Sequence, residues 1–160
     1  MRIGVISDTH GLLRPEAVER LRGAAHILHA GDIGAPQVLV ALRELAPVTA
    51  VRGNNDRVPW ARAVRVTETV RIGEVRIHLL HDLAELDIDP AAHGIRVVIS
   101  GHSHRPRIEE RAGVLYVNPG SAGPRRFRLP VAVARLEIDR TDVRAAIEEL
   151  VIGPAGARYP

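Results

Sequence analysis

Short apolar runs alternate with helical patterns over the first fifty residues of the chain. Three runs rich in β-branched residues predict strands, and they are Arg2–Ser7, His26–Ala30 and Val48–Val51. Two helical patterns lie between them, begun by Pro15 and Pro36. Their expected buried faces are Val18, Leu21 and Ala25 in the first helix and Val38, Leu39, Leu42 and Leu45 in the second. Single helices between successive strands predict a parallel βαβαβ unit.

The second half of the chain predicts further strands joined by short turns. The expected strands are Ala63–Ile72, Glu74–Leu80, Arg96–Ser100, Arg107–Arg111, Val114–Val117 and Val131–Ile138. Gly73 and Gly113 lie at tight reversals. The pattern of Val143–Leu150 fits a helix or a strand, and we favour a strand. So many strands predict an α/β fold in which two sheets pack together with helices outside.

Composition indicates one globular domain. The chain has 160 residues, 46% hydrophobic and 26% charged, which is ordinary for a single folded unit. We expect a domain over residues 1–152 and a loose tail over 153–160. The chain has no cysteine, which excludes disulfides and thiolate metal sites. No apolar run approaches the roughly 18 residues of a membrane span, and no secretory signal is recognisable, so we expect a cytoplasmic protein.

The charge of the chain is modest. The net charge is +3, with 22 arginines and no lysine. The aromatic residues are Trp60, Tyr116, Phe127 and Tyr159. A surface for single-stranded nucleic acid normally stacks bases on several aromatic rings, so nucleic-acid binding is disfavoured.

Five predicted strands end in a small or apolar residue followed by a metal-type ligand. These ends are Ser7-Asp8-Thr9-His10, Gly31-Asp32, Gly53-Asn54-Asn55-Asp56, Leu80-His81 and Gly101-His102-Ser103-His104. Ligands of α/β sheets bind at the carboxyl ends of the strands. The candidate metal ligands are Asp8, His10, Asp32, Asn54, His81, His102 and His104. Seven are too many for one ion and one short of two four-ligand sites, so we expect Asp32, from the middle strand, to bridge two ions.

The ligand types narrow the choice of metal. Imidazole and oxygen ligands without sulfur suit manganese, iron, zinc, nickel or cobalt, and ligand type does not choose among these. We favour two divalent transition-metal ions, with manganese first and the others as alternatives.

The order of these motifs resembles that of the calcineurin-like metallophosphoesterases. Asp-X-His, Gly-Asp, Gly-Asn, His and Gly-His-X-His follow one another, and Asn118-Pro119-Gly120-Ser121 resembles the small bacterial and archaeal phosphodiesterase branch. The resemblance implies a four-layer α/β/β/α sandwich of two mixed sheets flanked by helices, with a dinuclear centre. It implies one ion on Asp8, His10, Asp32 and His104, and another on Asp32, Asn54, His81 and His102.

Two positions depart from the family pattern. Asn55 stands where larger relatives carry a histidine that protonates the leaving group, so the identity of the general acid in this chain stays open. We expect Asn55 and Asp56 to support the metal ligands, with a left-handed turn as the alternative for Asn54 and Asn55. Asp82 follows His81 where many small relatives have glycine and a second histidine, and it either reaches a partner or caps a turn.

The remaining histidines and several arginines have open roles. We expect His26, His29, His78 and His93 to be structural or exposed, with His29 as the first candidate exception because it lies close to Asp32. The arginines near the motifs either hold a phosphate oxygen or are solvated surface charges, and they are Arg57, Arg105, Arg125, Arg126 and Arg128. The sequence assigns no substrate-binding residue.

Charge arithmetic predicts the reaction. Two divalent ions bring four positive charges and Asp8 and Asp32 two negative ones, which favours a metal-bridging hydroxide and attracts a phosphate diester anion. We expect a metal-dependent phosphodiesterase that acts on a small diester. A non-catalytic scaffold like the retromer subunit of this fold, and a nuclease, are the alternatives. The natural substrate, the native metal and self-association into a homo-oligomer stay open.

Overall fold

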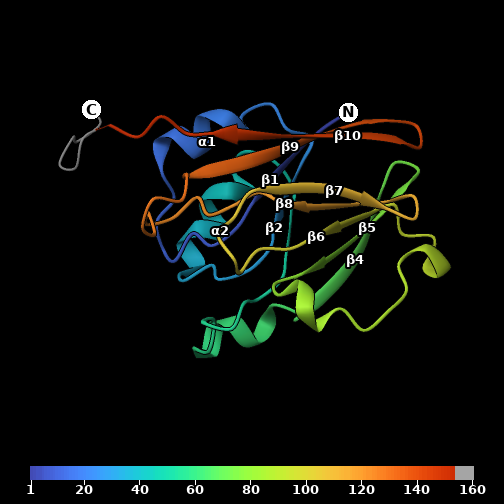
Figure 1. The fold of residues 1–160 in the computed structure, drawn as a ribbon. Helices are drawn as coiled ribbons and strands as arrows, with labels where there is room; N and C mark the ends of the chain where they lie inside the picture. Colours follow the sequence, from blue (N-terminus) through green and yellow to red (C-terminus); the bar gives the residue numbers. More distant parts are fainter. Residues whose placement is uncertain (154–160) are drawn as a thin grey trace.

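Two five-stranded sheets pack face to face in the computed structural model, which describes residues 1–153 (Figure 1). Apart from Gly153, the expected loose tail lies outside the described residues, and the domain bounds stay a prediction. No helix within residues 1–153 is both long and apolar enough to span a membrane.

The first sheet contains the predicted βαβαβ unit. Its strand order is β10-β9-β1-β2-β3. The bounds are β1 (Arg2–Ile6), β2 (His26–His29), β3 (Val48–Ala50), β9 (Ala132–Asp139) and β10 (Asp142–Glu149). Strands β1, β2 and β3 are parallel, and they are joined by α1 (Pro15–Leu21) and α2 (Pro36–Arg43). Strand β9 pairs antiparallel with β1, and β10 with β9, so the preference for a strand over Val143–Leu150 is confirmed.

The second sheet has the strand order β4-β5-β6-β8-β7. Its bounds are β4 (Thr67–Ile72), β5 (Val75–Leu80), β6 (Val97–Ile99), β7 (Arg107–Arg111) and β8 (Val114–Asn118). Strands β5, β6 and β8 are parallel, while β4 and β7 are the antiparallel edges. The expected strand start at Ala63 is wrong. A 3-10 helix, η1 (Pro59–Ala63), occupies that segment because the fixed φ of Pro59 suits a first helical turn.

Alternating side chains in each strand separate the buried residues into three layers. The middle layer lies between the sheets and includes Val5 and Leu79. The outer face of the first sheet packs against α1 and α2. Leu83 and Leu86, in and just after η2 (Leu83–Glu85), cover the outer face of the second sheet, and η3 (Ala91–His93) follows. The predicted sandwich of two mixed sheets flanked by helices is therefore confirmed, with both α-helices on the first sheet.

One part of the predicted helix face is wrong. Helix α1 ends at Leu21, so Ala25 lies outside the helix and is exposed. Ala17 and Ala24 are buried against the sheet instead.

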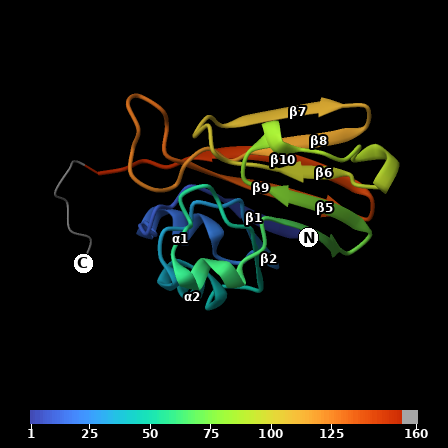
Figure 2. The same ribbon diagram turned by 90° about the horizontal axis from the view of Figure 1, so that it is seen from below.

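The parallel strands of both sheets run toward the same end of the sandwich. Figures 1 and 2 show β1 of the first sheet and β5 and β6 of the second pointing toward this end. The loops that follow these strands meet there, and every predicted metal ligand lies in one of them.

Candidate metal centre

The backbone at the predicted ligands is strained. Among residues 1–153, eight non-glycine residues have a positive φ, and five of these eight are predicted ligands. They are Asp8 (55°), His10 (47°), Asp32 (52°), His102 (69°) and His104 (59°). Non-glycine residues in such conformations cost about 1–3 kcal/mol each and cluster at functional sites. The backbone here serves the placement of side chains rather than local stability.

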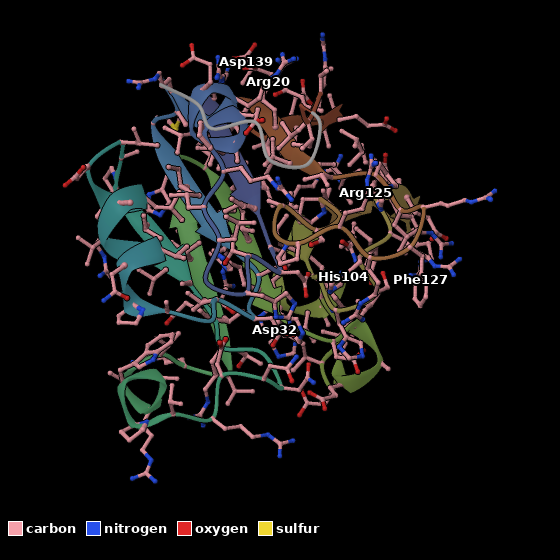
Figure 3. All side chains as sticks on the ribbon, turned by 90° about the vertical axis from the view of Figure 1, so that its left-hand side faces the viewer. Arg20, Asp32, His104, Arg125, Phe127 and Asp139 are labelled. Atoms are coloured by element: carbon pink, nitrogen blue, oxygen red, sulfur yellow. The ribbon has the colours of Figure 1, made fainter. Side chains whose placement is uncertain are left out.

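Two compact groups of ligand atoms lie at the carboxyl ends of the strands, where Figure 3 labels Asp32 and His104. The first group consists of Asp8, His10 and His104, with His104 Nε2 at 3.2 Å and His10 Nε2 at 4.0 Å from Asp8 Oδ1. The second consists of Asp8, Asp32 and His81, with His81 Nε2 at 3.3 Å from Asp32 Oδ2 and 3.9 Å from Asp8 Oδ1. Within each group the atoms lie within 4.8 Å of one another.

Both carboxylates lie between the two histidine groups. Asp32 Oδ2 is 3.8 Å from His10 Nε2 as well as 3.3 Å from His81 Nε2. Asp8 belongs to both compact groups, whereas the position of Asp32 after the middle strand predicts that Asp32 is the shared carboxylate. The bridging role of Asp32 stays a prediction.

Four buried polar atoms in this cluster have no hydrogen-bond partner among the described residues. They are Asp8 Oδ1, His10 Nε2, His81 Nε2 and His104 Nδ1. Buried polar atoms are normally hydrogen-bonded, because burial without a partner costs free energy. Converging nitrogen and oxygen atoms of this kind fit the coordination of a divalent transition-metal ion.

His81 is oriented as a metal ligand. Its Nδ1–H donates to the carbonyl oxygen of Ala30 at 2.8 Å, which leaves the Nε2 lone pair facing the carboxylates. Metal-binding histidines commonly have their second nitrogen held in this way. Burial alone would lower the pKa of His81, but Asp32, the Ala30 carbonyl and Asp8 together raise it above its ordinary value.

Asp32 is held in its ionised form. Burial alone would raise the pKa of its carboxyl group, but His81 and the hydrogen bonds from Asn55 lower that pKa well below its ordinary value. The Asn55 backbone N–H donates to Oδ1 at 2.9 Å and its side-chain amide donates to Oδ2 at 2.9 Å. An ionised carboxylate is the form that binds a metal ion.

Asn54 and His102 contact each other at the exposed rim. His102 Nδ1 lies 3.2 Å from Asn54 Oδ1, and His102 Nε2 lies 3.7 Å from Asp82 Oδ2. Asp82 also accepts a hydrogen bond from the Ala84 N–H, so it caps the turn of η2. His102 lies outside the two compact groups, yet its ring is 5.2 Å from that of His81. The rings of His10 and His104 form a second pair at 5.5 Å.

Asp56 joins the loops that carry the ligands. This buried carboxylate accepts hydrogen bonds from the backbone N–H groups of Ile33 and Gly34 at 3.0 Å each and of Gly53 at 2.9 Å. The loop after β2 is thereby fixed to the loop after β3. Asp56 thus supports the Asp32 loop.

Hydrogen bonds on both ring nitrogens define the role of His29, the candidate exception among the structural histidines. The Gly31 N–H donates to His29 Nδ1, so His29 Nε2 carries the proton and donates to Thr9 Oγ1 at 3.0 Å. Thr9 Oγ1 in turn donates to the carbonyl oxygen of Ile33. Complete burial lowers the pKa of His29 to about 4. A neutral imidazole therefore connects the Asp8 loop to the Asp32 loop.

Asp8 accepts three hydrogen bonds that its sequence motif alone does not predict. Ser7 Oγ donates to Asp8 Oδ2 at 2.7 Å, and the His102 N–H donates to the same oxygen at 3.2 Å. Ser121 Oγ donates to the Asp8 carbonyl oxygen at 3.0 Å. The Asn118–Ser121 segment therefore lies against the site through Ser121.

Two glycines permit the close approach of these loops. At Gly31, where φ is +98°, a Cβ atom would lie 2.7 Å from His81 Nδ1. At Gly53 a Cβ atom would collide with Asp32 Oδ1. The glycine that precedes a ligand in these motifs therefore makes room for the neighbouring ligand.

The other residues singled out in the sequence lie around the site. His26 and His78 pair with threonine hydroxyls and His93 is exposed, as expected. Arg57 Nε donates to the Asn54 carbonyl oxygen. The exposed loop before β9 contains Arg125, Arg126, Phe127 and Arg128. Figure 3 shows Arg125 and Phe127 on the same side of the view as His104.

The fold and the cluster of aspartates and histidines belong to a known superfamily. The family model of the calcineurin-like phosphoesterase superfamily domain matches residues 1–141, and the chain belongs to this superfamily. It is 39% identical over 155 residues to a "probable metallophosphoesterase" of Methanothermobacter thermautotrophicus, covering 89% of this chain and 90% of the relative.

Solved structures agree with this assignment. An archaeal phosphodiesterase superimposes with a TM-score of 0.75 at 25% identity, over 92% of this chain and all of that one. Vps29 of Entamoeba histolytica in complex with Zn²⁺ superimposes with a TM-score of 0.72 at 25% identity, over 93% of this chain and 99% of that one.

Proposed function

We propose that this chain is a phosphodiesterase that binds two divalent transition-metal ions and hydrolyses small phosphate diesters. The observation that supports it best is the convergence of Asp8 Oδ1, His10 Nε2 and His81 Nε2, which are buried and unpartnered among residues 1–153. The relatives named as metallophosphoesterases and phosphodiesterases support the same reaction class. Manganese is the favoured ion, with iron, zinc, nickel and cobalt as alternatives.

The proposed ligands divide between two ions. Asp8, His10, Asp32 and His104 would hold one ion, and Asp32, Asn54, His81 and His102 the other. The two histidine ring pairs, His10 with His104 and His81 with His102, support this division. The ions would supply Lewis acidity and an activated water at neutral pH.

The residues of the chain itself prepare the site for an anionic substrate. Asp8 and Asp32 carry two negative charges, fewer than two divalent ions would bring, so the loaded site attracts a diester anion. Asn55 keeps Asp32 ionised, and the carbonyl oxygen of Ala30 holds the His81 ring so that its Nε2 atom faces the two carboxylates. The Asn55 amide has no proton to deliver at neutral pH, so this position does not protonate the leaving group.

Removal and return of metal tests the function. The protein is treated with a chelator, dialysed, and assayed with bis(p-nitrophenyl) phosphate before and after addition of Mn²⁺. We expect hydrolysis only after metal is restored, and we expect the His104→Ala variant to remain inactive. Asp142→Asn, exposed at the β9–β10 turn, is the matched control and should retain full activity. Hydrolysis that persists in the chelated protein would contradict the proposal.

A metal-binding scaffold without catalysis is the second candidate. The similarity to Vps29 over nearly the full length of both chains favours it. A scaffold predicts that Mn²⁺ binds while no diester is hydrolysed, so the same assay separates the two functions. A nuclease would instead cleave DNA or RNA in preference to small diesters. The cytoplasmic location and self-association stay predictions.

A further inference from the structure

A cavity of about 280 Å³ opens beside His102, on the outer face of the second sheet. Its apolar walls come from Leu83 of η2 and from Tyr116 of β8. Asp82 and His102 line it as well, so the cavity adjoins the proposed metal centre. None of the motifs identified in the sequence accounts for it.

The volume and the walls of the cavity suit one flat ring. The guanidinium of Arg111 lies 4.4 Å from the centre of the Tyr116 ring, so two planar groups form part of the wall. Such surfaces attract aromatic rings by stacking. Drug-sized ligands occupy pockets of about 300–1,000 Å³, and a cavity just below that range fits a smaller group such as a single ring.

The charges of the cavity favour an anion. Arg105, Arg107 and Arg111 line it with two carboxylates, Asp82 and Glu109. Glu109 pairs with two of these arginines, since its Oε2 lies 2.6 Å from Arg107 Nη2 and its Oε1 lies 3.3 Å from Arg111 Nε. Among residues 1–153, the guanidinium of Arg105 takes part in no hydrogen bond or ion pair. Arg105 is therefore the cation available to a ligand.

The three arginines of the cavity are poor proton donors to a leaving group. Arginine stays protonated at neutral pH and does not act as a general acid. A leaving group needs its negative charge neutralised, whereas the ester substituent that remains on phosphorus does not. The retained substituent is the part of the diester that fits this environment.

We propose that this cavity binds the retained substituent of the diester and selects a single aromatic ring that carries an acidic group. Leu83 and Tyr116 contact the ring, and Arg105 pairs with the acidic group. This inference rests on the proposed phosphodiesterase function, and it specifies the class of substrate.

Three diesters with the same p-nitrophenyl leaving group test the proposal. Their retained substituents are methyl, phenyl and para-carboxyphenyl, and kcat/KM is measured with the Mn²⁺-loaded protein. Burial of a ring predicts a preference of about tenfold for phenyl over methyl. A partly exposed charge pair predicts a further preference of about threefold for para-carboxyphenyl over phenyl.

Variants assign each preference to a side chain. Arg105→Gln should remove the para-carboxyphenyl preference and keep the phenyl preference. Leu83→Asn should reduce the phenyl preference. Each result is a ratio of kcat/KM values for one protein preparation, so it does not depend on the fraction that is folded. Arg140→Gln, an exposed arginine paired with Glu74 at the opposite end of the sheets, should keep both preferences.

The outcomes separate this proposal from the proposed function. Equal kcat/KM values for the three diesters would overturn the cavity proposal while leaving the phosphodiesterase intact. If the loaded protein hydrolysed none of them, the proposed function would fail. The cavity is then tested by calorimetry with phenylphosphonate and methylphosphonate, where tighter binding of phenylphosphonate supports it and equal binding overturns it.

Discussion

Asn55 binds both oxygens of Asp32, through its backbone N–H and its side-chain amide, at 2.9 Å each. In larger relatives of the family this position carries a histidine that protonates the leaving group. Here the side chain is directed at a proposed metal ligand and lowers the pKa of its carboxyl group. Asn55 therefore acts on the reaction through Asp32.

We expect Asn55→Ala to weaken metal binding. Loss of the amide removes one of the two Asn55 donors to Asp32, and the pKa of Asp32 rises toward its ordinary value. Removing a hydrogen-bond partner of a metal ligand typically costs 10–100-fold in affinity, and we expect a loss in that range. Titration of metal-free protein with Mn²⁺ measures it. The Gln37→Ala variant, which lacks an exposed amide on α2, should bind Mn²⁺ with the same affinity as the unmodified chain. Unchanged affinity in Asn55→Ala would exclude this positioning role.

The leaving group should govern the rate. Because Asn55 cannot donate a proton, the enzyme lacks at this position the roughly 10²–10⁴-fold that a general acid contributes. Aryl diesters should be cleaved far faster than alkyl ones, with a steep dependence of kcat/KM on the pKa of the leaving group. Asn55→His should flatten that dependence, with metal content measured as the control. A shallow slope in the unmodified enzyme would show that another group protonates the leaving group.

Asp56→Asn should destabilise the fold. In the amide an NH2 group replaces one of the two accepting oxygens, so at least one of the backbone N–H groups of Ile33, Gly34 and Gly53 loses its acceptor. The expected loss is about 2 kcal/mol in the free energy of unfolding, measured by urea denaturation. Asp142→Asn at the exposed β9–β10 turn is the control. A loss below about 0.5 kcal/mol, the size of an ordinary surface substitution, would mean that Asp56 does not join the two loops.

His29 should make the metal-free fold sensitive to acid. Its pKa is 6.5 when unfolded and about 4 when folded, so between these values the unfolded chain binds a proton that the folded chain does not. Stability is therefore complete above about pH 6.5 and falls as the pH decreases toward 4, by about 3 kcal/mol in total. His29→Gln should lose this part of the pH dependence, while the exposed His93→Gln should keep it. Urea denaturation at pH 7.5 and pH 5 provides the comparison, and parallel curves for the unmodified chain and His29→Gln would contradict the role of His29.

Local patterns predict most of the fold. The β-branched runs and the two prolines that begin helices are strong local signals, and β1, β2, α1 and α2 lie where these signals place them. Boundaries are less well predicted, because α1 ends four residues before Ala25 and η1 replaces the expected strand start at Ala63. The second of these has a local cause in Pro59, whose fixed φ suits a first helical turn.

The strand-end motifs predict which residues meet, but not how they are supported. Asp8, His10, Asp32, His81 and His104 come together because each follows a parallel strand. The hydrogen bonds of Asp56 and of His29 join atoms from separate loops. The spacing of residues along the sequence does not predict such contacts. The cavity beside His102 could not be predicted from the sequence either, because Leu83, Arg105 and Tyr116 become neighbours only when the second sheet has formed.

Metal content tests the central claim most directly. Metal-free protein is incubated with excess Mn²⁺, freed of unbound ion, and analysed for metal per chain, in parallel with the Asp32→Asn, His104→Ala and Asn54→Ala variants. We predict two ions per chain, with a larger loss in Asp32→Asn than in either other variant because Asp32 would contact both ions. One ion or none in the unmodified chain would contradict the dinuclear centre, and equal losses in the three variants would remove Asp32 from the bridging position.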